Sequence, residues 1–233
     1  MKVRIQFSKH GAMKFIGHLD VMRYFQKAIR RAGIDIAYTG GFSPHQIMSF
    51  AAPLGVGLES DGEYVDIEVN SHQGATQMLE ALNEVMVEGI GIIRVKALPE
   101  NVKNAMASVA GAGYLVRFRD GYEPDFDWRS QLRLFYAKDQ IPFEKQTKKN
   151  TLTLDLKPAI YELNIQEDAV YMLVDASSAG NIKPSMVMEA FYQDNGCELP
   201  PFALEITRVD TYMNIGTETE RNLVPLWHVG EDF

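Results

Sequence analysis

The spacing of apolar residues changes twice in the first hundred residues, and this constrains the fold more than any other feature of the sequence. Val3–Phe7 alternates apolar and polar residues at period two, as a half-buried strand does. Leu19–Ala32 then follows a helical period, and Gly33 stands where helices commonly stop. The same criteria predict strands at Ile34–Tyr38, continued by Ile47–Ala51, and at Glu63–Val69, a helix at Ala75–Val87 and a strand at Ile90–Ala97. The order β-α-β-β-α-β is that of the ferredoxin-like split motif, an antiparallel sheet with both helices on one face.

The second half of the chain repeats this order of elements without visible sequence identity. The predicted elements are strands at Tyr114–Arg119, Phe143–Thr147, Thr151–Pro158, Ala159–Asn164, Val170–Asp175 and Leu204–Tyr212, and helices at Trp128–Ala137 and Lys183–Asn195. Lys145, Lys148 and Lys149, beside Asn150, form the charged tip of a predicted hairpin. We therefore predict an α+β protein with tandem ferredoxin-like domains, of which the second carries one extra hairpin.

The predicted domains cover residues 1–100 and 114–213. Residues 101–113 are rich in small side chains and are predicted to be a linker. The tail, residues 214–233, has few periodic features, which is typical of a disordered end, although Trp227 could pin it.

Positive charge is concentrated at the beginning of the chain. Residues 1–50 hold eight Lys and Arg against two Asp and Glu, a net charge of +6, whereas the remainder carries −14, which together give the −8 of the whole chain. An acidic protein with one basic segment is expected to use that segment to hold an anion. The single cysteine, Cys197, excludes an internal disulfide and is too few for a cluster held by three thiolates.

Two further features of the sequence bear on where the protein works. No apolar run approaches the roughly 18 residues of a membrane span. The N-terminal residues read as a strand and not as a signal peptide. We expect a cytoplasmic protein without a membrane partner.

The segment from Gly40 to Phe50 combines flexible backbone with polar side chains. Gly41 permits positive φ, and main-chain amides with Ser43, His45 and Ser49 could form a cradle for a phosphate or a base edge. Two phenylalanines, Phe42 and Phe50, could stack on bases. The alternative is a glycine-permitted hairpin whose phenylalanines enter the core.

A second polar group precedes and opens the first predicted helix. His18 lies near the helix N-terminus, where backbone donors and the dipole favour an anion, and Asp20 lies in the first turn. Simple capping is the alternative for both. His10, His18, His45 and Asp20 match no metal-binding spacing, and we predict no metal site.

The polar face of the same helix carries Arg23, Lys27, Arg30 and Arg31, and Lys9 and Lys14 precede it. This stripe is about 12 Å long at ~1.5 Å per residue, which suits the phosphates of a nucleic-acid strand. The alternative is an ordinary solvated face. The acidic, glycine-rich stretch from Leu54 to Asp66 is not followed by a helix, so it is not a phosphate-binding loop, and we predict a structural hairpin there.

Residues across positions 3–68 resemble a known family. The pattern is Phe7-Ser-Lys9-x-Gly11, Lys14-Phe-Ile-Gly-His18-Leu-Asp20 with Arg23, Gly41-Phe-Ser-Pro-His45, Met48-Ser-Phe50, Pro53-Leu, Glu59-Ser and Gly62-Glu63-Tyr with Asp66. It is similar to the radical-SAM-associated domain of unknown function, DUF2344. Such proteins occur alone or fused behind a B12-binding radical SAM protein. Gln46-Ile47 departs from the expected Pro-Lys pair, which removes a cation from that loop.

Three functions follow from these observations. The first is a non-catalytic RNA-binding accessory module, without a cofactor of its own, that presents tRNA, rRNA or another RNA to a separate radical SAM enzyme. Its contacts would be Lys9, Lys14, His18, Arg23, Lys27, Arg30, Arg31, Gly41, Ser43, His45 and Ser49. The second is a metal-independent endoribonuclease with His45 and His18 as catalytic residues. The third is a protein–protein scaffold whose acidic second half binds the partner.

Overall fold

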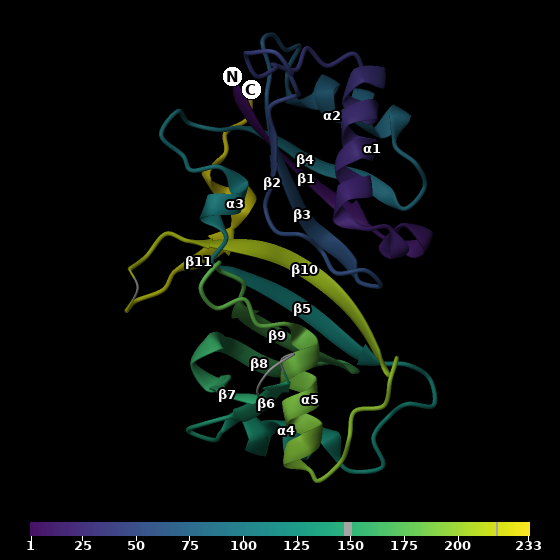
Figure 1. The fold of residues 1–233 in the computed structure, drawn as a ribbon, viewed down its shortest axis with the longest axis vertical. Helices are drawn as coiled ribbons and strands as arrows, with labels where there is room; N and C mark the ends of the chain where they lie inside the picture. Colours follow the sequence, from purple (N-terminus) through teal and green to yellow (C-terminus); the bar gives the residue numbers. More distant parts are fainter. Residues whose placement is uncertain (147–150, 218) are drawn as a thin grey trace. The chain divides into compact units, whose positions relative to one another are not determined.

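A computed structural model describes residues 1–146, 151–217 and 219–233 and shows a mixed α and β protein with mostly antiparallel sheets (Figure 1). Contacts divide the chain into two compact units. Unit 1 comprises Met1–Ala110 and Arg208–Phe233, and unit 2 comprises Gly111–Thr207. The end of the chain therefore belongs with its beginning, whereas the sequence analysis assigns those residues to a second domain and a tail. Within the described ranges, no helix is long and apolar enough to cross a membrane.

Unit 1 begins with strand, helix, strand, strand, helix and strand in that order. The elements are β1 (Lys2–Lys9), the 3-10 helix η1 (Gly11–Phe15), α1 (His18–Arg31), β2 (Met48–Phe50), β3 (Glu59–Glu68), α2 (Ala75–Val85) and β4 (Ile90–Ala97). Later segments add α3 (Ala105–Ser108), β11 (Leu223–Pro225) and the 3-10 helix η3 (Leu226–Val229). The strand predicted at Ile34–Tyr38 is reduced to single bridges at Ile36 and Tyr38, because the chain turns there into a protruding loop.

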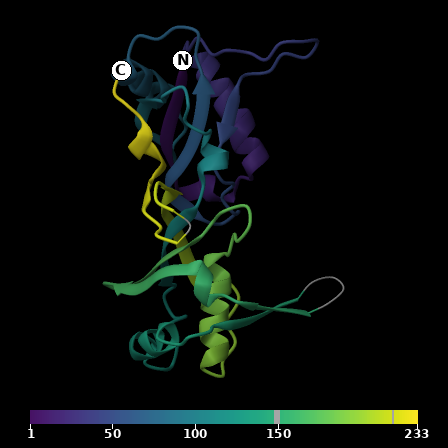
Figure 2. The ribbon, with the colours of Figure 1, turned by 90° about the vertical axis from the view of Figure 1, so that its left-hand side faces the viewer.

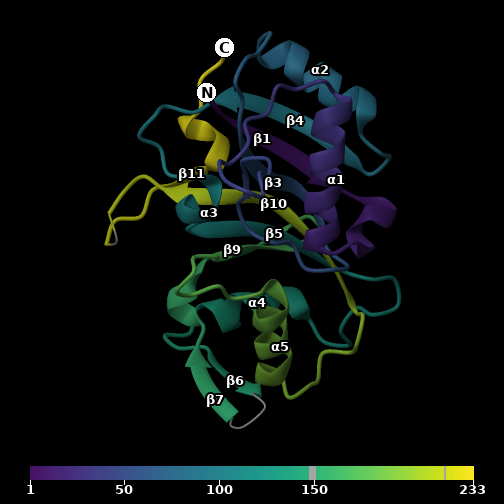
Figure 3. The same cartoon turned by 45° about the horizontal axis from the view of Figure 1, so that its top comes forward.

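Strand β1 is the centre of this sheet. Ile5 is opposite Val65 of β3 on one side and opposite Val95 of β4 on the other, and both pairings are antiparallel. Strand β2 pairs with β3 through Phe50, which is also opposite Val65. Helices α1 and α2 lie on one face of the sheet (Figures 1 and 3). The first core therefore forms between these two helices and the odd-numbered residues of β1, with Val3, Ile5, Phe7, Val21, Phe25, Ile29 and Leu82 all buried.

The opposite face of β1 is buried as well, which the sequence analysis did not predict. Arg4 is 1% exposed and Gln6 is 6% exposed, although the alternating pattern predicts solvent on that side. A second small core, made of Ala51, Tyr64, Ala105 and Leu226, lies there. Its last two residues come from α3 and η3, and the C-terminal segment runs along this side of the unit (Figure 2). Helical turns thus cover both faces of the sheet in unit 1.

A buried ion pair joins these parts. The guanidinium of Arg4 donates to both carboxylate oxygens of Asp66 at 2.8 and 2.9 Å. Its remaining donors reach the carbonyl oxygens of Leu226 at 2.8 Å and Lys103 at 3.3 Å. Asp66 in turn accepts from the backbone N–H of Ala105 at 2.6 Å. One charged pair therefore holds β1, β3, α3 and the C-terminal segment together.

Unit 2 has a similar order of elements, built around β5 (Gly111–Phe118). The others are α4 (Trp128–Tyr136), β6 (Pro142–Gln146), β7 (Thr151–Asp155), the 3-10 helix η2 (Lys157–Ala159), β8 (Ile160–Gln166), β9 (Ala169–Asp175), α5 (Pro184–Asp194) and β10 (Leu204–Asn214), which continues into unit 1. Strand β9 lies between β5 and β8, both antiparallel to it, with Tyr171 opposite Leu115 and Asn164. Helix α5 begins at Pro184, as the fixed φ of proline favours.

The extra hairpin of unit 2 is present as a separate two-stranded sheet of β6 and β7. Its tip, with Thr147, Lys148, Lys149 and Asn150, lies outside the described residues.

We expect that replacing Asp66 with alanine lowers the free energy of unfolding by about 3–5 kcal/mol, because it leaves the Arg4 guanidinium buried without its carboxylate. Urea denaturation followed by circular dichroism measures this loss.

The double variant Arg4→Met with Asp66→Leu is the matched control, because it removes both charges and keeps apolar volume. It should recover most of the lost stability. A single-variant loss below about 1 kcal/mol would show that the pair does not hold the unit together.

Candidate functional site

The outward side of α1 carries three of the four cations of the predicted stripe. Val21, Phe25, Ala28 and Ile29 are buried on the sheet side. Because each residue turns about 100° around a helix axis, the opposite side presents positions 23, 27 and 30. Arg23, Lys27 and Arg30 are all exposed, so these three cations can reach a partner from solvent.

The fourth cation of the stripe is directed elsewhere. Arg31 donates to the carbonyl oxygen of Val85 at 3.1 Å, and its guanidinium lies 5.8 Å from the ring centre of Tyr24. It therefore faces α2. Of the outward three, Arg23 lies 3.4 Å from Asp20 with both side chains mostly exposed, an arrangement that holds the arginine only weakly.

A protruding hairpin follows α1. A bridge between Tyr38 and Gln46 closes it, and Gly41 takes φ +96° at the turn. Phe42 is fully exposed, so the alternative in which it enters the core is wrong, whereas Phe50 is buried and cannot stack on a base. The Gln46 amide donates to the carbonyl oxygen of Gln26 at 3.2 Å, which fixes the base of the hairpin against α1.

His45 is held within this hairpin. Its backbone N–H donates to the Thr39 hydroxyl at 3.1 Å, and its Nδ1 lies 3.1 Å from the same oxygen. Ser43 is exposed beside it, whereas Ser49 is half-buried in β2, opposite Asp66. Ser43 and His45 are therefore available to a ligand, and Ser49 is set apart from them.

The two histidines of the predicted nuclease do not meet. The His18 ring contacts the Phe50 ring edge-on, with 5.4 Å between ring centres. His45 is bonded instead to the Thr39 hydroxyl within the hairpin. Among the described residues, no hydrogen bond or ring contact joins His18 to His45.

Lys9 and Lys14, predicted as phosphate contacts, are already bound to other groups of the protein. Lys9 is 2% exposed, and its Nζ donates to the carbonyl oxygen of Ile16 at 2.9 Å. Lys14 reaches the Glu59 carboxylate at 3.4 Å. Lys9 is in phase with Val3, Ile5 and Phe7, so the period of β1 itself directs it toward the core.

Lys9 belongs to a buried charge cluster at the N-terminal end of α1. The cluster contains Lys9, His18, Ser60, Glu63 and Arg208. One oxygen of Glu63 accepts from the Ser60 hydroxyl at 2.7 Å and from the Arg208 guanidinium at 2.8 Å. Buried charges are rare in proteins unless paired, which makes such a cluster a candidate for function.

A very small cavity of about 10 Å³ adjoins the cluster, with room for one water molecule at most. Its walls include the rings of Phe7 and Phe50. Of the cluster's members, only His18 is partly exposed to solvent.

Burial sets the protonation of the two basic groups. It lowers the pKa of the Lys9 ammonium, with Glu63 opposing this effect and Arg208 adding to it. Burial also lowers the pKa of the His18 imidazole, with Glu63 opposing and Lys9 adding to the effect. His18 is thus a neutral imidazole at neutral pH, able to accept a proton or a hydrogen bond.

A second histidine shows the opposite behaviour. Burial lowers the pKa of His10, but hydrogen bonds to Glu59 at 3.1 Å and Asp61 at 2.8 Å outweigh it and raise the pKa. This group fixes η1 against β3 and has no further role in the site. Within the described ranges, no group of three or more His, Cys, Asp or Glu side chains is arranged so that it could hold a metal ion.

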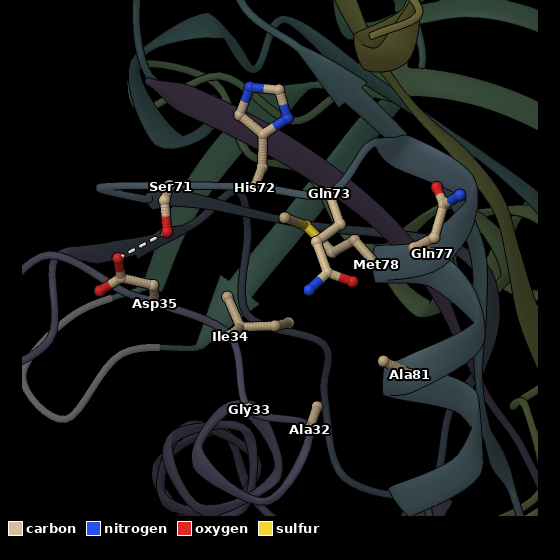
Figure 4. A pocket seen from close by; sticks show the side chains of 10 residues that line it. All are labelled: Ala32, Gly33, Ile34, Asp35, Ser71, His72, Gln73, Gln77, Met78 and Ala81. Atoms are coloured by element: carbon tan, nitrogen blue, oxygen red, sulfur yellow. Dashed lines mark hydrogen bonds between the residues drawn. The ribbon is translucent and has the colours of Figure 1, made fainter.

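A pocket of about 160 Å³ lies at the other end of α1, between that end and the start of α2 (Figure 4). Asp35 stands at its side and accepts from Asn70 at 2.9 Å and Ser71 at 2.7 Å, which lowers the pKa of its carboxyl. Ile34, Gln73 and Met78 point into the hollow. A carboxylate here disfavours an anion, so the pocket is not part of the cationic surface.

We expect the His18 imidazole to titrate below the ordinary value of about 6.5. Glu63→Gln should lower the titration midpoint further, because it removes the carboxylate that favours the imidazolium. Lys9→Met should raise the midpoint, because it removes a neighbouring cation. NMR titration of the imidazole signals measures all three values.

Glu59→Gln is the control for the His18 titration, since that carboxylate contacts His10 and not His18. It should leave the His18 midpoint unchanged. If Glu63→Gln and Lys9→Met shift the midpoint in the same direction, the charge cluster does not control His18.

No curated protein matches the chain in sequence. Among solved structures, one described as "Crystal Structure of a Cbf5-Nop10-Gar1 Complex" aligns with a TM-score of 0.48 at 12% identity, over 90% of this chain and 48% of that chain. Another, "X-ray crystal structure of a heavy metal efflux pump, crystal form II", aligns with a TM-score of 0.24 at 8% identity, over 90% of this chain and 28% of that one. The chain spans about half of the first and less than a third of the second. Neither likeness carries an argument about function.

Membership of a family is shown by sequence. A family model matches residues 2–184, which is most of the chain, and it extends the resemblance seen at positions 3–68 through the first segment of unit 1 and much of unit 2. The chain therefore belongs to the family described as "Uncharacterized protein conserved in bacteria (DUF2344)".

Proposed function

We propose that this protein binds RNA through the outward side of α1 and the hairpin that follows it. This α1–hairpin surface consists of Arg23, Lys27, Arg30, Phe42, Ser43 and His45. The observation that carries the proposal is the exposed cationic face of α1 beside a hairpin with a fully exposed aromatic ring, Phe42. Cations for phosphates and an aromatic face for a base are the two parts of a single-strand site.

The dimensions suit a short single strand. Positions 23 and 30 are about 10 Å apart along the helix at ~1.5 Å per residue, a span of two or three phosphates. The exposed ring of Phe42 offers a stacking platform to an unpaired base, which a duplex does not present. Ser43 and His45 lie beside Phe42 as hydrogen-bonding groups.

The partner in this proposal is a radical SAM enzyme. The chain has one cysteine and so cannot hold a cluster that needs three thiolates. The proteins that this chain resembles occur alone or fused behind a B12-binding radical SAM protein. Such an enzyme would supply the chemistry. We propose a cytoplasmic accessory protein, without a cofactor, that presents tRNA or rRNA to such an enzyme.

We also infer that each unit is a variant of the ferredoxin-like fold. In unit 1 the sheet order β4-β1-β3, with β2 also paired to β3, supports this inference. In unit 2 the order β5-β9-β8 is the corresponding part of the same pattern. Domains of this kind commonly bind RNA, but fold alone does not assign the function.

A second candidate function is metal-independent cleavage of the bound RNA. The observation in its favour is the lowered pKa of His18 beside Lys9, which leaves a neutral imidazole as a base. In this alternative, His18 is the catalytic base and His45 has no catalytic role. It predicts cut RNA in the presence of EDTA, and loss of cleavage in His18→Ala.

We expect the double charge reversal Arg23→Glu with Lys27→Glu to weaken RNA binding at least tenfold at low salt. It should also reduce the slope of log K against log salt by about 1.4, since each phosphate contact with a single strand contributes ~0.7. Fluorescence anisotropy with a labelled single-stranded RNA, at ~50 to ~200 mM salt, measures both.

Arg129→Glu with Arg133→Glu is the matched control, because it reverses two exposed arginines at the same spacing on α4. It should leave the affinity and the slope unchanged. Equal losses in the two double variants would mean that only net charge matters and that α1 is not the site.

A further inference from the structure

Unit 2 contains an open groove of about 520 Å³ beside α5. One wall is the face of α5 that carries Ser185, Glu189 and Gln193 at spacings of four residues. The chain after α5 turns back beside the helix (Figures 1 and 3). Residues 198–203 of this segment line the other wall. Leu204 and Ile206 of β10 add apolar surface to its lining. The size falls within the range of about 300–1,000 Å³ typical of ligand sites.

Phe202, at the rim of this groove, has an unusual backbone. Its φ is +63°, in the left-handed region that bulky side chains rarely adopt, and its side chain is 83% exposed. A glycine would take this conformation without strain. An aromatic residue held there and left in solvent contributes little to folding. Such strain tends to occur at binding sites, where the surrounding structure maintains it.

The wall of the groove is negatively charged. Glu189 is half-buried and Glu198 is exposed, and neither has a basic partner within ion-pair distance among the residues described. Burial raises the pKa of the Glu189 carboxyl, as is usual for a carboxylate that lacks a cation. No lysine or arginine lines the groove. A basic group of a partner would complete this wall.

We propose that this groove binds a polypeptide segment of another protein, with a large apolar side chain against Phe202 and Leu204 and a lysine or arginine against Glu189. Two unpaired carboxylates disfavour the phosphates of RNA, which separates this surface from the one on α1. Exposed aromatic residues at the edge of a pocket are the usual anchors of protein interfaces. The proposal does not depend on RNA binding by unit 1.

A random twelve-residue peptide library, selected on the full-length protein and counter-selected on Phe202→Gly, tests the proposal. We expect selected peptides to combine leucine, phenylalanine or tryptophan with lysine or arginine. One synthetic peptide from the selection is then titrated by fluorescence anisotropy against each variant. Glu189→Gln and Phe202→Gly should each weaken its binding at least fivefold.

Two readouts separate binding from folding. Phe202→Gly relieves the positive φ, so it should keep or raise the melting temperature while it weakens binding. Glu144→Gln is the matched control, because Glu144 is an exposed glutamate of unit 2 that does not line the groove. It should leave peptide affinity unchanged.

Four results would overturn the proposal. The first is a selection that yields no peptides, or acidic ones, and the second is equal affinity for the wild-type protein and both groove variants. The third is a wild-type dimer that Phe202→Gly makes monomeric, which would assign the groove to a second copy of this chain. The fourth is loss of RNA affinity, with unchanged peptide affinity, in Phe202→Gly, which would assign Phe202 to nucleic acid.

Discussion

The buried pair of Arg4 and Asp66 is the interaction on which the architecture of unit 1 depends. A guanidinium removed from water is costly unless its donors are used, and here four of its five N–H groups reach both oxygens of one carboxylate and two carbonyls. Those carbonyls belong to Lys103 and Leu226, so the pair requires both segments to return to the sheet. The C-terminal residues therefore complete unit 1. Both faces of β1 are buried, although its sequence alternates apolar and polar residues.

Local periodicity predicts local elements in this chain, but not what covers them. The period of two from Val3 to Phe7 and the helical period from Leu19 to Ala32 correspond to β1 and α1. The same patterns predict a solvent-facing side for β1, because the residues that cover it lie about a hundred and two hundred positions further along the chain. The burial of Arg4 depends on partners that no sequence window around it contains.

In the candidate site, too, local periodicity predicts some features, whereas others depend on residues far away in the sequence. The helical period alone identifies the outward side of α1 with Arg23 and Lys27. It does not show that Arg31 turns to the Val85 carbonyl, since that partner lies on another helix. The phase of Lys9 in β1 indicates that its side chain is buried. No local pattern predicts the contact of Glu63 with Arg208, which lies 145 residues away.

The net charge of a sequence segment overstates the charge that a partner of the folded protein meets. The first fifty residues have a net charge of +6, but several of these cations are already matched inside the protein. Arg4 faces Asp66, Lys14 faces Glu59, and burial lowers the pKa of Lys9. The cations left exposed in this segment are Lys2, Arg23, Lys27, Arg30 and Arg31, of which three lie on the outside of α1. Electrostatic attraction from so few cations is modest, so the RNA binding proposed above requires the aromatic contact of the hairpin or the help of a second protein.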